Sequence, residues 1–213
     1  MMKIDRIEPV TLQEHLMKLC LSDGSVIKTQ DYVIADLGLF PGAELDEDGL
    51  TQLKEAAGKA SAKNRAVRII SAAGVSKQEL EHRLIQKGEK PEDAEEAVRW
   101  LSDLELLDDA KTAKQLVDSA VRKGYGINRI RQILYKKRIP KEFWEEALEQ
   151  VPEMDDAVDR FLRQRLHGEE PDQKEVKRTI DALLRRGYSW QDIRAGLQRY
   201  SASLDEYLEE PYE

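Results

Sequence analysis

The stretch Arg122–Ile139 reads RKGYGINRIRQILYKKRI, and it indicates which fold the chain adopts. Apolar residues recur at Ile130, Ile133 and Leu134, which is the spacing of one buried face of an α-helix. The glycines ahead of them are typical of a break between two helices. The remaining positions hold seven Lys or Arg and no acid. We therefore predict a helix that follows a tight turn and combines an apolar inner face with a basic outer one.

This pattern occurs three times along the chain. When Gly88, Arg138 and Gly187 are aligned, the preceding segments read LEHRLIQKG, IRQILYKKR and IDALLRRG, and the following ones KPEDAEEAVRWL, PKEFWEEALEQV and SWQDIRAGLQRY. Each has helical apolar spacing, and a further helix is expected ahead of each pair, at about 60–73, 109–123 and 154–167. A three-helix unit of this size buries little alone, so three stacked repeats are physically sensible.

The first sixty residues follow a different pattern. Leu16–Gln30 reads LMKLCLSDGSVIKTQ, in which Asp23-Gly24 between alternating apolar residues predicts a β-hairpin. An earlier strand is expected to begin near Val10 and Thr11, and DYVIADLGL predicts a short helix that ends near Gly38.

The predicted fold is mainly α. Three tandem three-helix repeats form an elongated curved body, preceded by a small N-terminal unit that contains a β-hairpin. The expected domains are an acidic N-terminal unit at 1–59, repeats at 60–108, 109–153 and 154–200, and an acidic tail at 201–213.

Charge is sorted along the chain, although the net charge is −8. Residues 110–200 hold twenty Lys or Arg against fifteen Asp or Glu, whereas the tail 201–213 has five acids and no base. The bases expected to meet a partner or a nucleic-acid backbone are Arg122, Lys123, Arg129, Arg131, Lys136, Lys137, Arg138, Lys177, Arg178, Arg185 and Arg186. The alternative is an ordinary solvated face, and cations near a helix C-terminus are favourable for structural reasons alone.

No pattern for catalysis, a metal or a cofactor emerges. The three histidines are far apart, the single Cys20 has no partner, and no glycine-rich nucleotide motif is present. Glu44–Glu55 has carboxylates at positions of a calcium loop, but no helix is evident ahead of it, and we favour Asp46–Asp48 as the cap of a helix that starts near Gly49. With no apolar run long enough to cross a membrane and no export signal, we expect a cytoplasmic monomer without cofactor or metal.

Several motifs resemble those of the RecX recombination regulators. Lys123–Ile139 is similar to the central family motif KGYG-x-x-RI-x-x-x-L-x-x-KGI, Leu101–Asp109 to the link L-x-x-x-GYLDD, and Leu183–Ile193 to LxRRGF-x-x-x-x-I. The similarity covers roughly residues 60–200 and includes all three repeats. The chain departs from the pattern in two places. Arg138 replaces the usual Gly, and Glu105-Leu106 replaces Gly-Tyr.

The resemblance implies a non-enzymatic modulator of the RecA recombinase in recombination, DNA repair and the SOS response. Such proteins bind the RecA nucleoprotein filament and restrain its growth, ATP hydrolysis and strand exchange, with single-stranded DNA in the filament as a further contact. The family has no short catalytic signature, so no active residues follow from it. The alternative is a stand-alone DNA-binding protein whose stacked units act like helix-turn-helix readers, although the chain's net charge of −8 argues against that.

Overall fold

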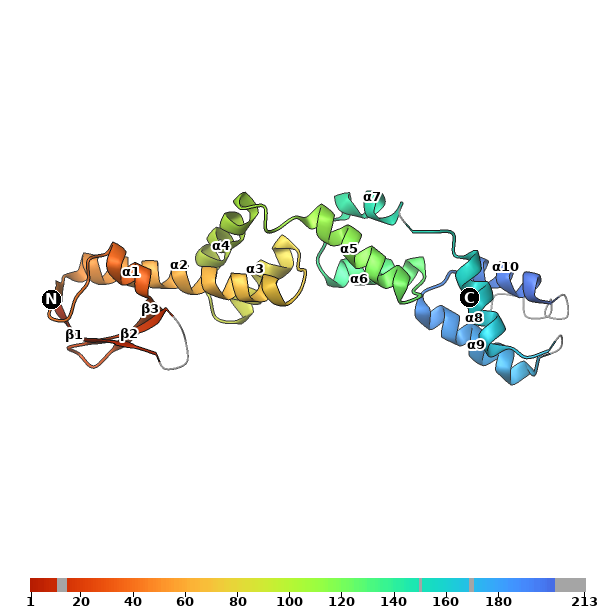
Figure 1. Ribbon diagram of the computed structural model, residues 1–213, viewed down its shortest axis with the longest axis horizontal. Coiled ribbons are helices and arrows are strands. Elements are labelled where there is room, and N and C mark those ends of the chain that lie inside the picture. Colours follow the sequence, from red (N-terminus) through yellow and green to blue (C-terminus); the bar gives the residue numbers. More distant parts are fainter. Residues whose placement is uncertain (11–14, 150, 169–170, 202–213) are drawn as a thin grey trace. The chain divides into compact units, whose positions relative to one another are not determined.

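The computed structural model describes residues 1–10, 15–149, 151–168 and 171–201 (Figure 1). The chain forms two compact units, which divide between Asp108 and Asp109. The first unit contains a sheet and the first repeat, and the second contains the other two repeats. Each unit is described by itself.

The first unit begins with a four-stranded antiparallel sheet. Its strands are β1 (Met2–Pro9), β2 (Leu16–Leu21), β3 (Val26–Gln30) and β4 (Glu44–Leu45), in the order β3-β2-β1-β4. The predicted hairpin is confirmed, because β2 and β3 pair across the turn with Cys20 opposite Val26. Gly24 in this turn has a φ of 83°, a left-handed conformation that glycine adopts without strain.

The strand ahead of the hairpin is β1, which ends at Pro9. The strand expected to begin near Val10 and Thr11 falls on residues 11–14, which lie outside the described residues. The pairing of β1 with β2 shifts between Ile4 and Arg6, so the simple alternation that marks a strand is broken there. The two residues of β4 are too few to give any pattern of their own.

One helix connects the sheet to the first repeat. After the short helix α1 (Asp31–Asp36), α2 runs from Glu47 to Ala72 without interruption, across the expected domain boundary at residues 59 and 60. Early in α2, Leu53 packs into the core of the sheet with Ile4 and Leu19. Its later residues Ala62 and Ala66 pack into the core of the first repeat. A single helix therefore contributes to both hydrophobic cores.

The start of α2 also decides between the two interpretations of Glu44–Glu55. Asp46 is the N-cap residue, and its side-chain oxygen accepts a hydrogen bond from the Gly49 backbone N–H at 2.7 Å. Residues from Glu47 onward are already helical, so the segment does not form a twelve-residue calcium loop. The calcium interpretation is therefore wrong, and the acids near this helix start stabilise its N-terminus.

The predicted threefold repeat is confirmed. The later part of α2 packs with α3 (Lys77–Gln86) and α4 (Pro91–Asp103). The second repeat comprises α5 (Asp109–Arg122), α6 (Ile127–Lys136), the 3₁₀ helix η1 (Lys141–Phe143) and α7 (Trp144–Leu148). The third comprises α8 (Asp155–Arg165), α9 (Gln173–Arg186) and α10 (Trp190–Tyr200). Each repeat has its own buried core.

The third helix of the second repeat is shorter than the sequence PKEFWEEALEQV suggests. Its first turn is the 3₁₀ helix η1, and α7 covers only five residues. The Trp144 indole N–H donates to the Ile139 carbonyl at 2.9 Å, which ties this segment back to the end of the loop after α6. Ala147 nevertheless reaches the core of the repeat, so the predicted packing role is kept by a shorter element.

The three residues that align the repeats in the sequence share one backbone conformation. Gly88, Arg138 and Gly187 have φ values of 91°, 54° and 86°, and each follows the middle helix of its repeat. Such a left-handed residue ends many helices, because it turns the chain so that backbone N–H groups can bond to the last carbonyls. The sequence alignment of the repeats therefore rests on a physical feature, the turn that ends the middle helix.

Within the part of the chain that the structure describes, no helix combines the length and apolar character that crossing a membrane would need.

Candidate partner-binding surface

The opening stretch of the sequence forms a tight joint with the third repeat. The turn between α5 and α6 contains Gly124, Tyr125 and Gly126, and the turn between α9 and α10 contains Gly187 and Tyr188. These two turns lie far apart in the sequence and are bonded to each other in the second unit. The joint fixes α6 and α9, which carry most of the predicted basic residues, relative to each other.

Backbone hydrogen bonds join the C-terminal end of α9 to the N-terminal end of α6. The Gly126 N–H donates to the Arg186 carbonyl at 2.9 Å, and the Asn128 N–H donates to the Gly187 carbonyl at 3.0 Å. The first N–H groups of a helix and its last carbonyls have no partners inside that helix. Here each end supplies what the other lacks, and the positive end of one helix dipole meets the negative end of another.

Side chains add to the same joint. The phenol O–H of Tyr188 donates to the Gly124 carbonyl at 3.2 Å, and burial raises the pKa of this phenol, so it remains a protonated donor. Arg186 reaches the carbonyls of Lys123 and Gly124 at 3.4 Å each. Its guanidinium group also lies 5.0 Å from the centre of the Phe161 ring on α8. The predicted site residue Arg186 is thus engaged within the fold.

The joint leaves no room for larger residues at its two central glycines. A Cβ atom at Gly126 would collide with the Gly187 carbonyl and the Tyr188 amide, and one at Gly187 would collide with the backbone of Arg129. Both obstacles are backbone, which cannot rotate away as a flexible side chain would. The sequence shows these glycines but not that they touch, because no local pattern reports contacts between segments more than sixty residues apart.

Most of the predicted basic residues are exposed. Within the described residues no carboxylate pairs with the exposed members of the set, which are Arg122, Lys123, Arg129, Arg131, Lys136, Lys177, Arg178 and Arg185. The guanidinium group of Arg129 donates to the Gln132 side chain at 3.1 Å and lies 6.0 Å from the centre of the Tyr125 ring. Lys137 and Arg138 are half-buried and have interactions within the fold.

Some other bases of the second unit differ from this set because they are paired. Arg199 on α10 contacts Asp159 on α8 with two nitrogens, at 2.8 and 3.0 Å, and these hydrogen bonds raise the pKa of the guanidinium group. Lys114 on α5 contacts Glu146 on α7 at 2.6 Å. These pairs hold helices of one repeat together, so they have a structural role that the unpaired bases lack.

The structure places the predicted residues in three places on the second unit. Lys123, Arg129 and Arg186 lie at the joint, and Arg122 and Arg185 are next to them in the chain. Lys136, Lys137 and Arg138 are at the other end of α6, about 10 Å along its axis from Arg129 at the usual helical rise. Lys177 and Arg178 lie about two turns before the end of α9.

An aromatic residue stands among the exposed bases of α6. The side chain of Tyr135 is 75% exposed, and Arg131 precedes it by one helical turn while Lys136 follows it directly. The sequence of α6, INRIRQILYK, contains no acid. Exposed tyrosine and arginine are the residue types enriched where proteins bind partners, and this surface carries both.

The described residues contain no group of three or more His, Cys, Asp or Glu side chains arranged to hold a metal ion. His15 and His167 each contact one carboxylate instead, Asp31 at 2.7 Å and Glu175 at 3.2 Å. On the second unit, the groups that we consider candidates for binding are the exposed cations and Tyr135.

Comparisons with known proteins agree with the motifs. Residues 108–148 match a family model described as RecX, second three-helix domain. A regulatory protein RecX of Vibrio parahaemolyticus is 33% identical over 144 residues, which are 64% of this chain and 90% of that protein. The chain belongs to the RecX family. A RecX of Cronobacter sakazakii is 34% identical over 148 residues, covering 62% of this chain and 87% of that protein.

Solved structures show that the RecX fold extends over most of the chain. A crystal structure of a regulatory protein RecX superposes with a TM-score of 0.61 at 22% identity, covering 92% of this chain and 100% of that one. A RecX from Lactobacillus salivarius gives 0.59 at 20% identity, covering 67% of this chain and 96% of that one. The predicted fold class, helical repeats after a small antiparallel sheet, is confirmed for this RecX-family chain.

Proposed function

We propose that this chain is a regulator that binds the nucleoprotein filament of the RecA recombinase and restrains its growth, ATP hydrolysis and strand exchange. The observation that carries the proposal is membership of the RecX family, whose relatives are regulatory proteins. The chain acts by binding rather than by catalysis, in recombination and DNA repair, with single-stranded DNA of the filament as a further contact.

The second unit supplies a suitable binding surface. The exposed members of the predicted basic set have no acidic partners in the described residues, so their charge is available to acidic groups of a protein or to phosphates. Tyr135 adds an aromatic side chain that a partner can bury. Contacts of this kind weaken as salt rises, because counterions compete for the same charges.

The test is the single-stranded-DNA-dependent ATPase of RecA from the same organism, measured with the chain added at substoichiometric levels. We expect inhibition by the wild-type chain. The double variant Arg131→Glu, Lys136→Glu should inhibit less, because it replaces two exposed cations of α6 by anions. Exposed charge changes typically alter the free energy of unfolding by about 0.5 kcal/mol or less, so the variant should remain folded.

A matched control makes the same change in charge elsewhere on the second unit. Lys141 and Arg194 are exposed bases outside the proposed surface, and Lys141→Glu, Arg194→Glu should inhibit like the wild type. Equal inhibition by all three proteins would show that α6 is not part of the interface. An unaffected ATPase, combined with binding of the chain alone to naked DNA at physiological salt, would instead support a stand-alone DNA-binding protein.

A further inference from the structure

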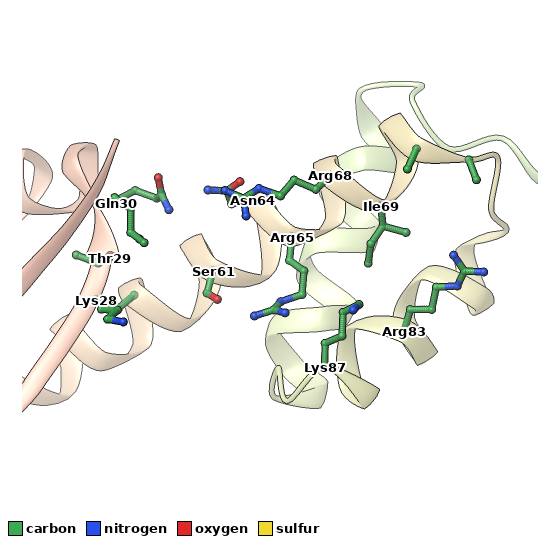
Figure 2. Close-up of a pocket in the computed structure, with 14 residues that line it drawn as sticks. Lys28, Thr29, Gln30, Ser61, Asn64, Arg65, Arg68, Ile69, Arg83 and Lys87 are labelled. Carbon is green, nitrogen blue, oxygen red and sulfur yellow. The ribbon is translucent and has the colours of Figure 1, made fainter. Parts of the chain in front are cut away.

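A cleft in the first unit gathers positive charge that the family resemblance does not explain. It has a volume of about 650 Å³ and lies between β3, α2 and α3. No Asp or Glu belongs to its lining, which includes five bases from the three elements: Lys28, Arg65, Arg68, Arg83 and Lys87. Figure 2 shows Lys28 on the strand at one side, Lys87 and Arg83 at the other, and Arg65 and Arg68 on the helix between them.

The surroundings make this collection of charge unexpected. Residues 1–108 contain fourteen Lys or Arg against twenty-one Asp or Glu, so the unit as a whole is acidic. Bases placed at random on such a unit would be near acids. Cations held together without an anion repel one another, which is unfavourable for the fold unless something else binds there.

Two of the five bases are held in place by acids just outside the cleft. Arg65 contacts Glu89 at 2.6 Å, and Arg83 contacts Glu79 at 2.7 Å. The Ser61 hydroxyl also donates to Glu89, at 2.9 Å, so this carboxylate fixes two lining residues at once. The paired carboxylates offset the positive charge of Arg65 and Arg83, and they orient the remaining N–H groups of both side chains.

The other three bases have no such compensation. Lys28, Arg68 and Lys87 are exposed, and none of them contacts a carboxylate in the described residues. They come from three different places in the fold, Lys28 from β3, Arg68 from α2 and Lys87 from the C-cap position directly after α3. A ligand that contacts all three must carry more than one negative oxygen, and a diphosphate group has that chemistry.

The wall of the cleft also contains polar and apolar groups. Thr29 is 2% exposed, and its hydroxyl has no hydrogen-bond partner in the described part of the chain, although buried hydroxyl groups are normally bonded. The amides of Gln30 and Asn64 are close by in the lining, as are the apolar side chains of Leu16 and Ile69. Amides and apolar carbons together suit the base and sugar of a nucleotide.

We propose that this cleft binds the diphosphate of a nucleotide, with Lys28, Arg68 and Lys87 contacting the phosphates. The volume lies within the range of about 300–1,000 Å³ typical of small-molecule sites. A single nucleotide fits such a space, whereas a nucleic-acid strand would need a track that continues beyond it. This activity is separate from the proposed action on the RecA filament.

The test is isothermal titration calorimetry of the full chain with ADP, inorganic pyrophosphate and adenosine, each used alone. We expect ADP and pyrophosphate to bind, more weakly as salt rises, and adenosine not to bind at millimolar concentration. Arg68→Ala, Lys87→Ala should weaken ADP binding on the order of tenfold or more, because each lost base removes a charge-assisted hydrogen bond. Lys54→Ala, Lys90→Ala removes two exposed bases outside the cleft and should bind like the wild type.

Three results would overturn the proposal. The first is no heat from ADP or pyrophosphate at millimolar concentration, and the second is equal ADP binding by wild type and Arg68→Ala, Lys87→Ala. The third is an oligo(dT) strand that binds through Arg68 and Lys87 while ADP does not, which would make the cleft a nucleic-acid contact. The titration uses the chain without RecA, so its outcome is independent of the filament assay. Circular dichroism of both double variants checks that they are folded.

Discussion

Glu105 occupies a backbone conformation that glycine adopts more easily, and replacing it should stabilise the first unit. Its φ is 57°, in the left-handed region, directly after α4 and its cap residue Leu104. The Glu105 N–H donates to the Ser102 carbonyl at 2.9 Å, and the Leu106 N–H donates to the Leu101 carbonyl at 3.0 Å. These two bonds form the motif that ends many helices, for which glycine is the usual residue.

The size of the effect follows from two opposing terms. A residue with a Cβ pays about 1–2 kcal/mol to be left-handed, and Glu105→Gly removes that cost. The new glycine loses about 0.5–1 kcal/mol more conformational entropy when the chain folds. Glu105 is exposed and has no hydrogen bond or ion pair through its side chain in the described structure, so nothing else is lost. The expected net gain is about 0.5–1 kcal/mol, or about 2–8 °C in Tm for a unit near 100 residues.

Urea unfolding measures this gain. Trp100 is the single tryptophan in residues 1–108, so a background with Trp144→Phe and Trp190→Phe reports on the first unit alone by fluorescence. Gly88→Ala is the matched control. Gly88 has a φ of 91° and open space where a Cβ would lie, so alanine there should lower the free energy of unfolding by about 1 kcal/mol through backbone strain alone. If Glu105→Gly leaves the midpoint unchanged or lowers it while Gly88→Ala destabilises, the reasoning about Glu105 is refuted.

Two further predictions concern the joint and the pH dependence of the first unit. Gly126 has a φ of −76°, which alanine adopts freely, so backbone strain does not contribute. Gly126→Ala should destabilise the second unit by about 1–3 kcal/mol, because the added Cβ collides with the backbone of Gly187 and Tyr188. An unchanged urea midpoint would contradict the tight joint. Hydrogen bonds from Lys59 and then Lys63 lower the pKa of Glu96 below its usual 4.5. Because this pKa is lower in the folded state, the unfolded state binds more protons as the pH falls. The stabilisation that the ion pairs of Glu96 contribute is therefore complete above about pH 5 and is lost toward pH 3. Glu96→Gln should reduce that decrease in stability, and a pH profile parallel to the wild type would show that the ion pairs contribute nothing measurable.

Much of the fold could be predicted because its signals are local. The repeats follow from apolar spacing, and their alignment follows from the turn that ends each middle helix. Asp23-Gly24 predicted the hairpin for the same reason, since the conformation of a short turn depends mainly on its own residues. The continuous α2 was not expected, because Gly49 and Gly58 weaken the local preference for a helix and tertiary packing overrides it.

The functional surfaces were only partly predictable. The exposed bases of α6 stand out in the sequence because they are consecutive or nearly so. The cleft bases do not, because Lys28, Arg65 and Lys87 are widely separated in the sequence. The role of Arg186 at the joint was also hidden, because it depends on Gly124 and Phe161 from other elements. A charge pattern in the sequence describes a single segment, whereas a cleft or a joint forms only when the fold brings distant segments together.

The joint between α6 and α9 has a consequence for how the second repeat can meet DNA. A helix-turn-helix reader presents the first turn of its second helix to the double helix, where free amide groups and the positive dipole end face phosphates and bases. In this chain the first turn of α6 is occupied, because Gly126 and Asn128 already donate to carbonyls of Arg186 and Gly187. The N-terminal end of α6 is therefore unavailable to a groove of DNA. A phosphate that meets α6 would be bound along the sides of this helix, by flexible lysine and arginine side chains that contact a backbone without selecting a sequence.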